Sequence, residues 1–216
     1  MSNSRLERIP EHLAPQKGEI QLFKNKLLER LSRISPRTVL AVYLPLVALS
    51  IWKSFSIGIS AQAFALVFAA GFISWTLFEY VFHRYVFHFI PEGPFQERVQ
   101  FLFHGVHHQY PNDKDRLVMP IALSLVVAVL LFSLFNVLLG EYVWANTAGF
   151  MLGYLVYDMT HYIIHHAKPP KSVYLKRLWK HHLDHHYRDT NKGYGVSSAA
   201  WDHVFGTAQK QKSTQK

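Results

Sequence analysis

The chain has 216 residues, half of them hydrophobic and 15% aromatic, and carries a formal net charge of +9. This length predicts one domain. The absence of cysteine excludes a disulfide framework, a zinc–thiolate site and an iron–sulfur cluster, so any metal must take nitrogen or oxygen ligands. The basic residues flank apolar blocks instead of forming one stripe, which argues against a nucleic-acid partner.

The N-terminal segment, residues 1–37, is polar and charged and lacks the early apolar region of a cleavable signal. Between Glu19 and Ser35, apolar residues recur at helical spacing, with basic residues elsewhere around the wheel. This pattern predicts an amphipathic helix. Such a helix lies in a membrane interface or packs on a cap as an ordinary soluble helix, and the sequence leaves both open.

Four apolar blocks follow, each close to the roughly 20 residues that a helix needs to cross about 30 Å of hydrocarbon. They span residues 39–59, 61–81, 117–140 and 142–164. A small chain with four such blocks has too little remaining sequence to bury them as helices of a soluble protein. We therefore predict an all-α integral membrane protein with four transmembrane helices.

The distribution of Lys and Arg predicts the orientation of these helices. Eight lie in residues 1–37, four in 82–116 and ten from residue 166 onward, whereas the two short connections hold only Lys53. The positive-inside rule then places both termini and the middle loop in the cytoplasm. The expected membrane is the bacterial inner membrane or the endoplasmic reticulum.

Ten histidines fall into four closely spaced clusters, all on the predicted cytoplasmic side. The clusters are His83 and His88; His104, His107 and His108; His161 and His165; and His182, His185 and His186. Imidazole is the commonest metal ligand among side chains, and ten are too many for one closed zinc site. The clusters predict two metal ions, each with four or five nitrogen ligands. Imidazole suits zinc, copper, iron or nickel.

The spacing within three of the clusters places the histidines on one helix face, since residues at i, i+3 and i+4 are neighbours there. His83 and His88 differ, because five residues turn an ideal helix by about 140°. We expect this pair either to reach different metals or to straddle the end of a helix.

Two carboxylates are placed to orient ligand histidines. Asp158 lies three residues before His161, and Glu79 lies four before His83. A ligating histidine usually donates its other N–H to such a group. Three further acids are open between this role and an ordinary surface position: Asp184, Asp189 and Asp202. The remaining histidines are interpreted as structural or as supports of the ligands: His12, His166, His181 and His203.

Five segments carry a family resemblance: FEYVFHRYVFH (78–88), HGVHHQYPND (104–113), MLGYLVYDMTHYIIHH (151–166), HHLDHHYRD (181–189) and GYGVSSAAWDHVFGT (193–207). They resemble the fatty acid 2-hydroxylases of the membrane-bound fatty acid hydroxylase superfamily. The resemblance implies four transmembrane helices and a cytoplasmic cap, with a dimetal centre held by the ten clustered histidines. It implies O2-dependent hydroxylation of the acyl carbon next to the carbonyl, on fatty acyl lipids of the sphingolipid or ceramide class. Iron is the implied metal, and zinc can replace it in purified protein.

The resemblance covers roughly residues 38–207, which are the expected hydroxylase domain, between the N-terminal segment and a disordered tail at 208–216. Some members carry a cytochrome b5 domain with a His-Pro-Gly-Gly haem motif, and this sequence has no such motif. We therefore expect a separate electron donor of the cytochrome b5 or ferredoxin type, attracted to the basic surface.

Two alternatives stay open. One is another di-iron membrane enzyme, such as a carotenoid hydroxylase or a desaturase. The other, from a different class, is a membrane metal transporter or sensor. Transport would place polar ligands along the spans, whereas here they gather at one end.

Overall fold

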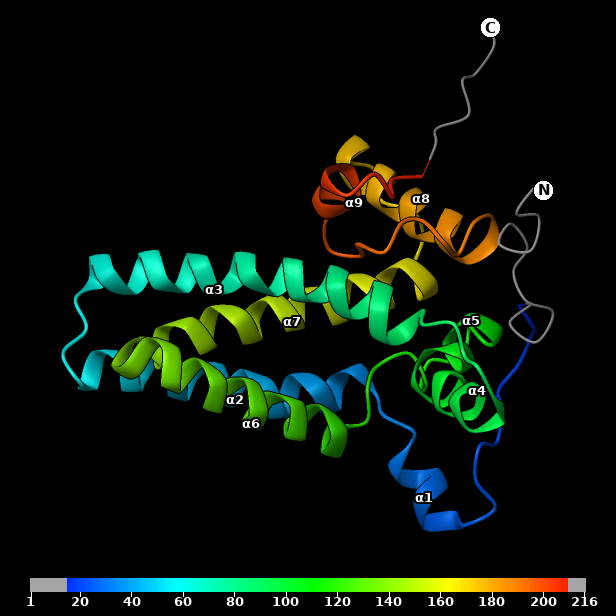
Figure 1. The fold of residues 1–216 in the computed structure, drawn as a ribbon, viewed down its shortest axis with the longest axis horizontal. Coiled ribbons are helices and arrows are strands. Elements are labelled where there is room, and N and C mark those ends of the chain that lie inside the picture. The colour runs from blue at the N-terminus through cyan, green and yellow to red at the C-terminus, as the bar shows by residue number, and fades with distance from the viewer. Residues whose placement is uncertain (1–14, 210–216) are drawn as a thin grey trace, which may run out of the picture.

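The computed structural model describes residues 15–209, so His12 and most of the expected tail lie outside the described residues. Its longest helices are α2 (Pro36–Ser56), α3 (Ala61–Phe82), α6 (Ile121–Leu139) and α7 (Val143–His166). They run side by side with alternating direction (Figure 1). No β-strand occurs within residues 15–209.

Local sequence signals fix where these helices begin and end. The Ser35 side chain accepts a hydrogen bond from the Thr38 N–H and so caps α2, and Ser60 caps α3 in the same way. The third apolar block begins at residue 117, but its helix starts only after Pro120. That helix ends at Gly140, whose φ of 55° is readily adopted only by glycine.

Judged by length and composition, three helical stretches of the described chain are able to cross a membrane: Pro36–Ser56, Ala61–Phe87 and Ile121–His166. The third is 46 residues long and contains both α6 and α7. These two helices are joined by a short 3-10 turn, η5 (Gly140–Tyr142), where the chain reverses direction (Figure 1).

Helix α7 occupies the centre of the bundle, where it packs against both α2 and α3. Small residues permit the close approach to α3. A Cβ atom added to Gly153 would lie 2.6 Å from the Cβ of Trp75, and one added to Gly149 would overlap the carbonyl oxygen of Phe68. The two helix backbones therefore meet almost directly, which fixes the position of the histidines at the end of α7.

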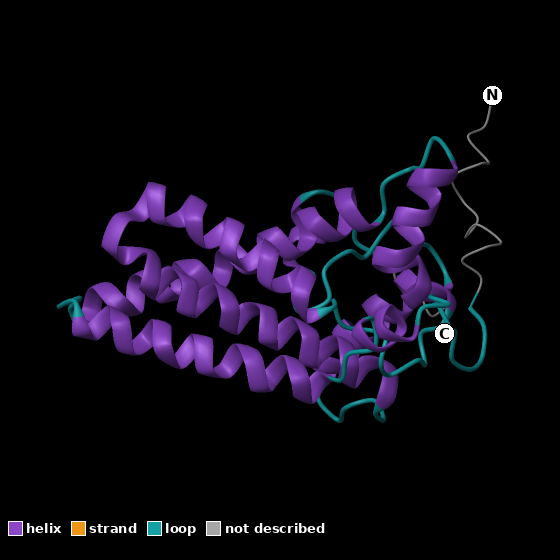
Figure 2. Ribbon diagram, turned by 90° about the horizontal axis from the view of Figure 1, so that it is seen from below, coloured by secondary structure: helices purple, strands orange, loops and turns teal. Residues whose placement is uncertain are grey.

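The remaining helical elements gather at the end of the bundle where α3 and α7 finish (Figures 1 and 2). They are two π-helical turns, η3 (His83–Phe87) and η4 (Phe101–Gly105), and the helices α4 (Pro94–Gln100), α5 (Val106–Gln109), α8 (Val173–Tyr187) and α9 (Ala200–Val204). Every clustered histidine lies in or next to these elements or in the last turns of α7.

The amphipathic helix expected from Glu19 to Ser35 is much shorter in the structure. Only α1 (Lys26–Leu31) is helical, because the Asn25 side chain caps it by accepting from the N–H groups of Leu27 and Leu28. The prediction is therefore wrong for residues 19–25 and 32–35. Hydrophobic spacing alone does not reveal such a local cap.

Candidate metal centre

The ten predicted ligand histidines come together as two groups of five. The first group is His83, His88, His104, His108 and His185; the second is His107, His161, His165, His182 and His186. Within each group the candidate ligand nitrogens all lie within 4.8 Å of one another. Eight of the ten side chains are buried, and the other two, His88 and His165, are partly buried.

His83 and His88 belong to the same group, and a π-helical turn explains how. The N–H of His88 donates to the carbonyl oxygen of His83 over 3.1 Å, which is the five-residue bond of a π-helix. The α-helix ends at Phe82, so the pair straddles a helix end instead of reaching two different metals. A π-turn places residues five apart one above the other, which an ideal α-helix does not do.

Adjacent residues of α5 and α8 face different groups. His107 lies in the second group and His108 in the first, while His185 lies in the first and His186 in the second. Each of these helices therefore contributes ligands to both groups. The two groups are adjacent: the ring of His108, from the first group, stacks on that of His186, from the second, with centroids 4.1 Å apart.

The nitrogen spacing within the groups suits a metal ion. The Nε2 atom of His104 lies 3.0 Å from the Nε2 atoms of both His83 and His108. In the second group, His107 and His186 are separated by 3.0 Å in the same way. A metal–imidazole bond of about 2.1 Å separates two ligands by about 3.0 Å at a right angle and by about 3.4 Å at a tetrahedral angle. The donor sets thus fit ions with more than four ligands.

Burial keeps these imidazoles in the neutral form that binds a metal. It lowers the pKa of seven of the clustered histidines well below the ordinary value, and neighbouring imidazoles lower it further. These histidines are His88, His104, His107, His108, His182, His185 and His186. A neutral imidazole offers a lone pair at once, so no proton has to leave before a metal binds.

Backbone carbonyls orient two histidines of the first group, His83 and His185. The Nδ1–H of His83 donates to the Tyr194 carbonyl over 2.5 Å, and that of His185 donates to the Lys192 carbonyl over 2.8 Å. Each ring therefore presents Nε2 to the interior of the group. Neither carbonyl was predicted from the sequence; Tyr194 lies in the segment 193–207 that carries the family resemblance, whereas Lys192 lies just before it.

Two buried carboxylates hold the loop that supplies these carbonyls. Asp202 accepts hydrogen bonds from the N–H groups of Tyr194 and Gly195 over 2.9 and 2.8 Å, and also from His181 and Thr207. Burial alone would raise the pKa of Asp202, but these hydrogen bonds outweigh it and hold the pKa below its ordinary value. The carboxylate is therefore ionised at neutral pH.

Glu79 is the second carboxylate at this loop. It accepts from the N–H groups of Val196 and Ser197 over 2.5 and 2.9 Å, and from the Ser197 hydroxyl. Its hydrogen bonds thus go to the segment after Tyr194 and not to a histidine ring. Glu79 links the end of α3 to the loop that orients His83.

Asp158 lies on α7 one turn before His161 and is only 1% exposed. Its Oδ2 atom and both ring nitrogens of His161 have no hydrogen-bond partner among the described residues. A buried imidazole with no partner at either ring nitrogen is costly unless another group, such as a metal ion, binds it.

The other singled-out residues are less central. His166 packs its ring on Tyr162, and His203 is exposed on α9. His181 donates to Asp202 and so supports the loop. Asp184 forms ion pairs with Lys180 and Arg188 on the outer side of α8, and Asp189 pairs with Lys192.

A largely apolar cavity of about 250 Å³ extends from the bundle to the first histidine group. Its lining includes apolar and aromatic side chains of α3, α6 and α7: Trp75, Phe78, Leu131, Phe135, Phe150 and Tyr157. His83, His104 and Asp158 also line the cavity. Such a cavity suits a hydrocarbon chain that ends beside the candidate metal ligands.

Two groups of candidate metal ligands lie at one end of membrane-length helices, and the first group borders an apolar cavity, which is the arrangement expected of a membrane enzyme that acts on a hydrophobic molecule. Comparison with known proteins makes the class specific. The family model for fatty acid hydroxylases matches residues 68–207. The chain belongs to the fatty acid hydroxylase family.

Relatives agree over most of the chain. A dihydroceramide fatty acyl 2-hydroxylase of Arabidopsis thaliana is 36% identical, over 97% of this chain and 88% of its own length. The ceramide very long chain fatty acid hydroxylase of Saccharomyces cerevisiae is 39% identical, over 92% of this chain and 51% of its own length. A solved structure of full-length scs7p, in which only the hydroxylase domain is visible, has a TM-score of 0.82 and 37% identity. The match covers 88% of this chain and 72% of the scs7p chain.

Proposed function

We propose that this protein hydroxylates carbon 2 of a long acyl chain that is amide-linked in a ceramide-type lipid. The observation that carries the proposal is the cavity, which leads from between the long helices to His83 and His104. Relatives named as dihydroceramide or ceramide hydroxylases support the choice of lipid. They also favour hydroxylation over desaturation and over metal transport.

We propose the ten clustered histidines as ligands of two iron ions. Bound iron would supply the activation of O2, which is the oxidant, so that one of its oxygen atoms is inserted into a C–H bond. The other oxygen atom leaves as water, which consumes two electrons and two protons. The protein binds the chain in the apolar cavity, presents carbon 2 beside His83 and His104, and keeps bulk water out with a lining of aromatic side chains.

Asp158 is proposed to act next to this site. It lines the cavity and has an unpartnered oxygen one turn before His161. With a metal bound to His161, a carboxylate at this distance along the helix is placed to fix the tautomer of the imidazole. Replacement by Asn should leave the fold intact and lower metal affinity or activity about 10–100-fold. Two metals per chain with unaltered activity would remove Asp158 from the site.

We propose that α2, α3, α6 and α7 each cross the membrane, with the histidine groups and both termini in the cytoplasm. The support is the excess of Lys and Arg at this end of the bundle. A reporter fused to the C-terminus should be found on the cytoplasmic side, and a reporter on the other side would reject this orientation.

Electrons are proposed to come from an acidic donor protein of the cytochrome b5 or ferredoxin type. The exposed bases Lys176, Arg177 and Lys180 on α8 support an electrostatic contact. Added donor should raise turnover, and high salt should weaken the effect. Full turnover with a small-molecule reductant and no donor protein would contradict the proposal.

The experiment that tests the function is mass spectrometry of lipids incubated with purified, iron-loaded protein, a donor system and O2. The expected product is a ceramide with one added oxygen at carbon 2 of its acyl chain. A new double bond, or hydroxylation elsewhere along the chain, would reject the proposed reaction.

A further inference from the structure

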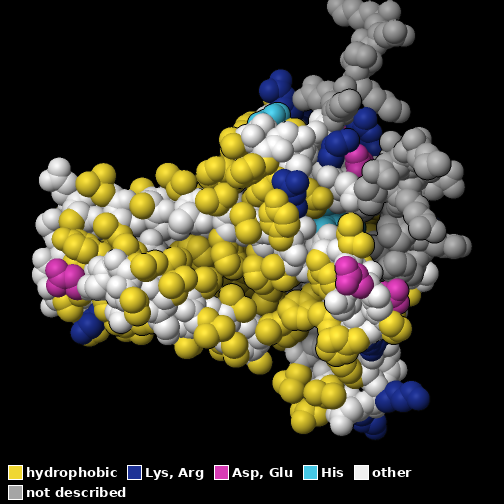
Figure 3. Space-filling model, in the orientation of Figure 1, with side chains coloured by type: hydrophobic (Ala, Val, Ile, Leu, Met, Phe, Trp, Pro, Cys, Tyr) yellow, Lys and Arg dark blue, Asp and Glu magenta, His cyan; other side chains and the backbone are white. Residues whose placement is uncertain are grey.

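Three leucines of the short helix α1 lie on the surface of the protein. Leu27, Leu28 and Leu31 are 64%, 49% and 57% exposed. At the lower edge of the molecule, where Figure 1 places α1, hydrophobic side chains face the bundle side and basic side chains face away (Figure 3). This division is that of a helix at a membrane interface.

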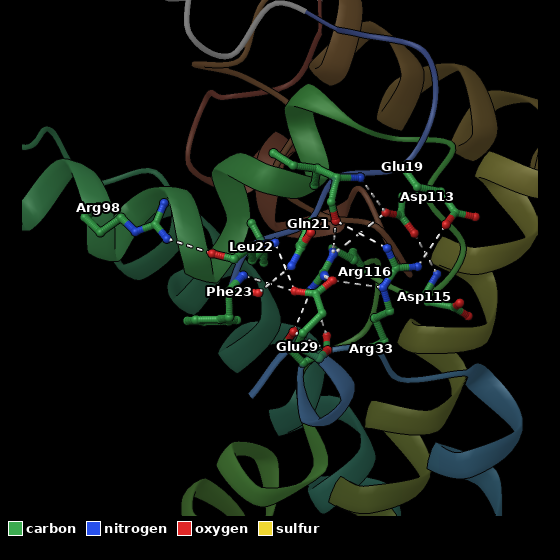
Figure 4. A network of polar contacts seen from close by, with 12 residues as sticks. Glu19, Gln21, Leu22, Phe23, Glu29, Arg33, Arg98, Asp113, Asp115 and Arg116 are labelled. Carbon is green, nitrogen blue, oxygen red and sulfur yellow. Dashed lines mark hydrogen bonds and ion pairs between the residues drawn. The ribbon is translucent and has the colours of Figure 1, made fainter. Parts of the chain in front are cut away.

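A polar network fixes the orientation of α1 (Figure 4). Glu29, on the inner side of the helix, accepts hydrogen bonds from the N–H groups of Leu22 and Phe23 over 3.0 and 3.1 Å and pairs with Arg33 and Arg116. The Arg116 side chain is almost fully buried and also donates to the Ser32 hydroxyl over 2.7 Å. With this face tied to the protein, the leucines point outward.

The inner side of the same segment forms part of the cavity. Leu22, Phe23, Ser32 and Arg116 line the space that reaches His83 at its other side. Both backbone polar groups of Leu22 are held, because its N–H donates to Glu29 and its carbonyl accepts from Arg98 over 3.2 Å. One short segment therefore presents leucines to the outside and a cavity wall to the inside.

We propose that α1 is seated in the interfacial layer of the membrane, and that the lipid enters the cavity from the bilayer alongside this segment. Lipid is the occupant that the features of this surface favour. The leucines come shortly before the apolar helix α2, which begins at Pro36, and Lys24, Lys26 and Arg30 are exposed beside them to meet anionic head groups. The access route rests on the proposed function; the membrane seat of α1 does not.

The depth of α1 is measured with spin labels, because the chain has no cysteine and a single introduced one is labelled uniquely. The variant Leu28→Cys is compared with Arg30→Cys on the same helix, in nanodiscs of phosphatidylcholine and phosphatidylglycerol. The label at position 28 should collide freely with O2 and resist a water-soluble nickel complex, and the label at position 30 should do the reverse. Equal exposure to nickel overturns the proposal, as does shielding of position 28 from both reagents, since a protein partner would then cover it.

The access route is tested with the double variant Leu27→Ser and Leu28→Ser. In nanodiscs, its KM for a ceramide should rise about tenfold, since each leucine contributes to the seat in hydrocarbon. With the same ceramide dispersed in detergent, KM and kcat should match those of the unaltered protein. An unchanged KM in nanodiscs overturns the access route, whereas absence of any turnover in the unaltered protein refutes the proposed function and leaves the spin-label result standing.

Discussion

The carbonyl oxygen of Tyr194 accepts a hydrogen bond from the Nδ1–H of His83 across 111 positions of sequence. The direction of this ligand ring therefore depends on a loop near the end of the chain. That loop is held in turn by Asp202, which accepts from the N–H groups of Tyr194 and Gly195. Loss of Asp202 should therefore weaken metal binding at the proposed site, although none of its described hydrogen bonds goes to a clustered histidine.

Replacing Asp202 by Asn should lower metal affinity or activity about 10–100-fold while the protein stays folded. In the Asn variant, an amide NH2 group would replace a carboxylate oxygen that now accepts a hydrogen bond from a backbone N–H of the loop. Two donors would then face each other, so the loop must shift. Competition with a chelator measures the affinity. The matched control is Glu97→Gln on the exposed side of α4, which should bind metal as the unaltered protein does. Equal affinity in both variants would show that the loop does not position His83.

Replacing a single histidine from either group should remove one metal and abolish hydroxylation. His107 and His185 belong to different groups, so His107→Ala and His185→Ala should each lower the metal content from two ions per chain towards one. Elemental analysis of detergent-purified protein is the measurement. His203→Ala, at an exposed position on α9, is the control and should keep both ions. Near-normal turnover of either ligand variant would contradict the two-site assignment.

The metal-free protein should lose stability as the pH falls below about 6.5. Burial lowers the pKa of the folded histidines, for example His104, His108 and His186, so they resist protonation. The unfolded chain takes up protons at about pH 6.5 and binds more of them, which favours unfolding as the pH falls further.

The histidine effect is separable from that of the carboxylate in the loop. The pKa of Asp202 is already below its ordinary value, so its stabilising effect is present above about pH 4 and is lost only in stronger acid. Unfolding midpoints measured in detergent from pH 7.5 downward should therefore drop first through the histidine window. A midpoint that stays level from pH 7.5 to pH 5 would contradict the prediction.

Replacing Gly153 by Ala should destabilise the bundle by about 1–3 kcal/mol. The added Cβ would lie 2.6 Å from the Cβ of Trp75, so α3 and α7 must separate. A shift in the thermal midpoint of the detergent-solubilised protein measures the effect. The control is Gly93→Ala, where an added Cβ has open space and φ is extended. Equal midpoints for the two variants would argue against tight packing of α3 on α7.

Much of this architecture could be predicted from the sequence because two of its signals are strong and local. The apolar blocks at 61–81 and 142–164 agree with α3 and α7 to within two residues at each end. The His-x2-His-His spacing predicted that His104, His107 and His108 would belong to the histidine site, but not that His107 would face one group while His104 and His108 face the other. That division depends on how α5 and α8 pack between the groups, which is a tertiary property.

Other features could not be predicted because they depend on backbone hydrogen bonds or distant contacts. The π-turn that unites His83 and His88 has no marker in residue spacing, since α-helical geometry separates them by about 140°. Every residue has a backbone carbonyl, so nothing in the sequence marks those of Tyr194 and Lys192 as hydrogen-bond acceptors for histidines. The amphipathic pattern from Glu19 to Ser35 overestimated a helix because Asn25 and Glu29 impose local caps and turns that outweigh periodicity.

Each histidine group includes residues from α8, and this has a consequence for how the protein is made. Ligands of the first group extend from His83 to His185, and those of the second from His107 to His186. Neither group is complete on the ribosome until nearly the whole chain has emerged, by which time the four long helices have been synthesised. Metal loading of the proposed sites would therefore follow helix synthesis, and a nascent chain stalled before α8 would hold only incomplete sets of the histidines.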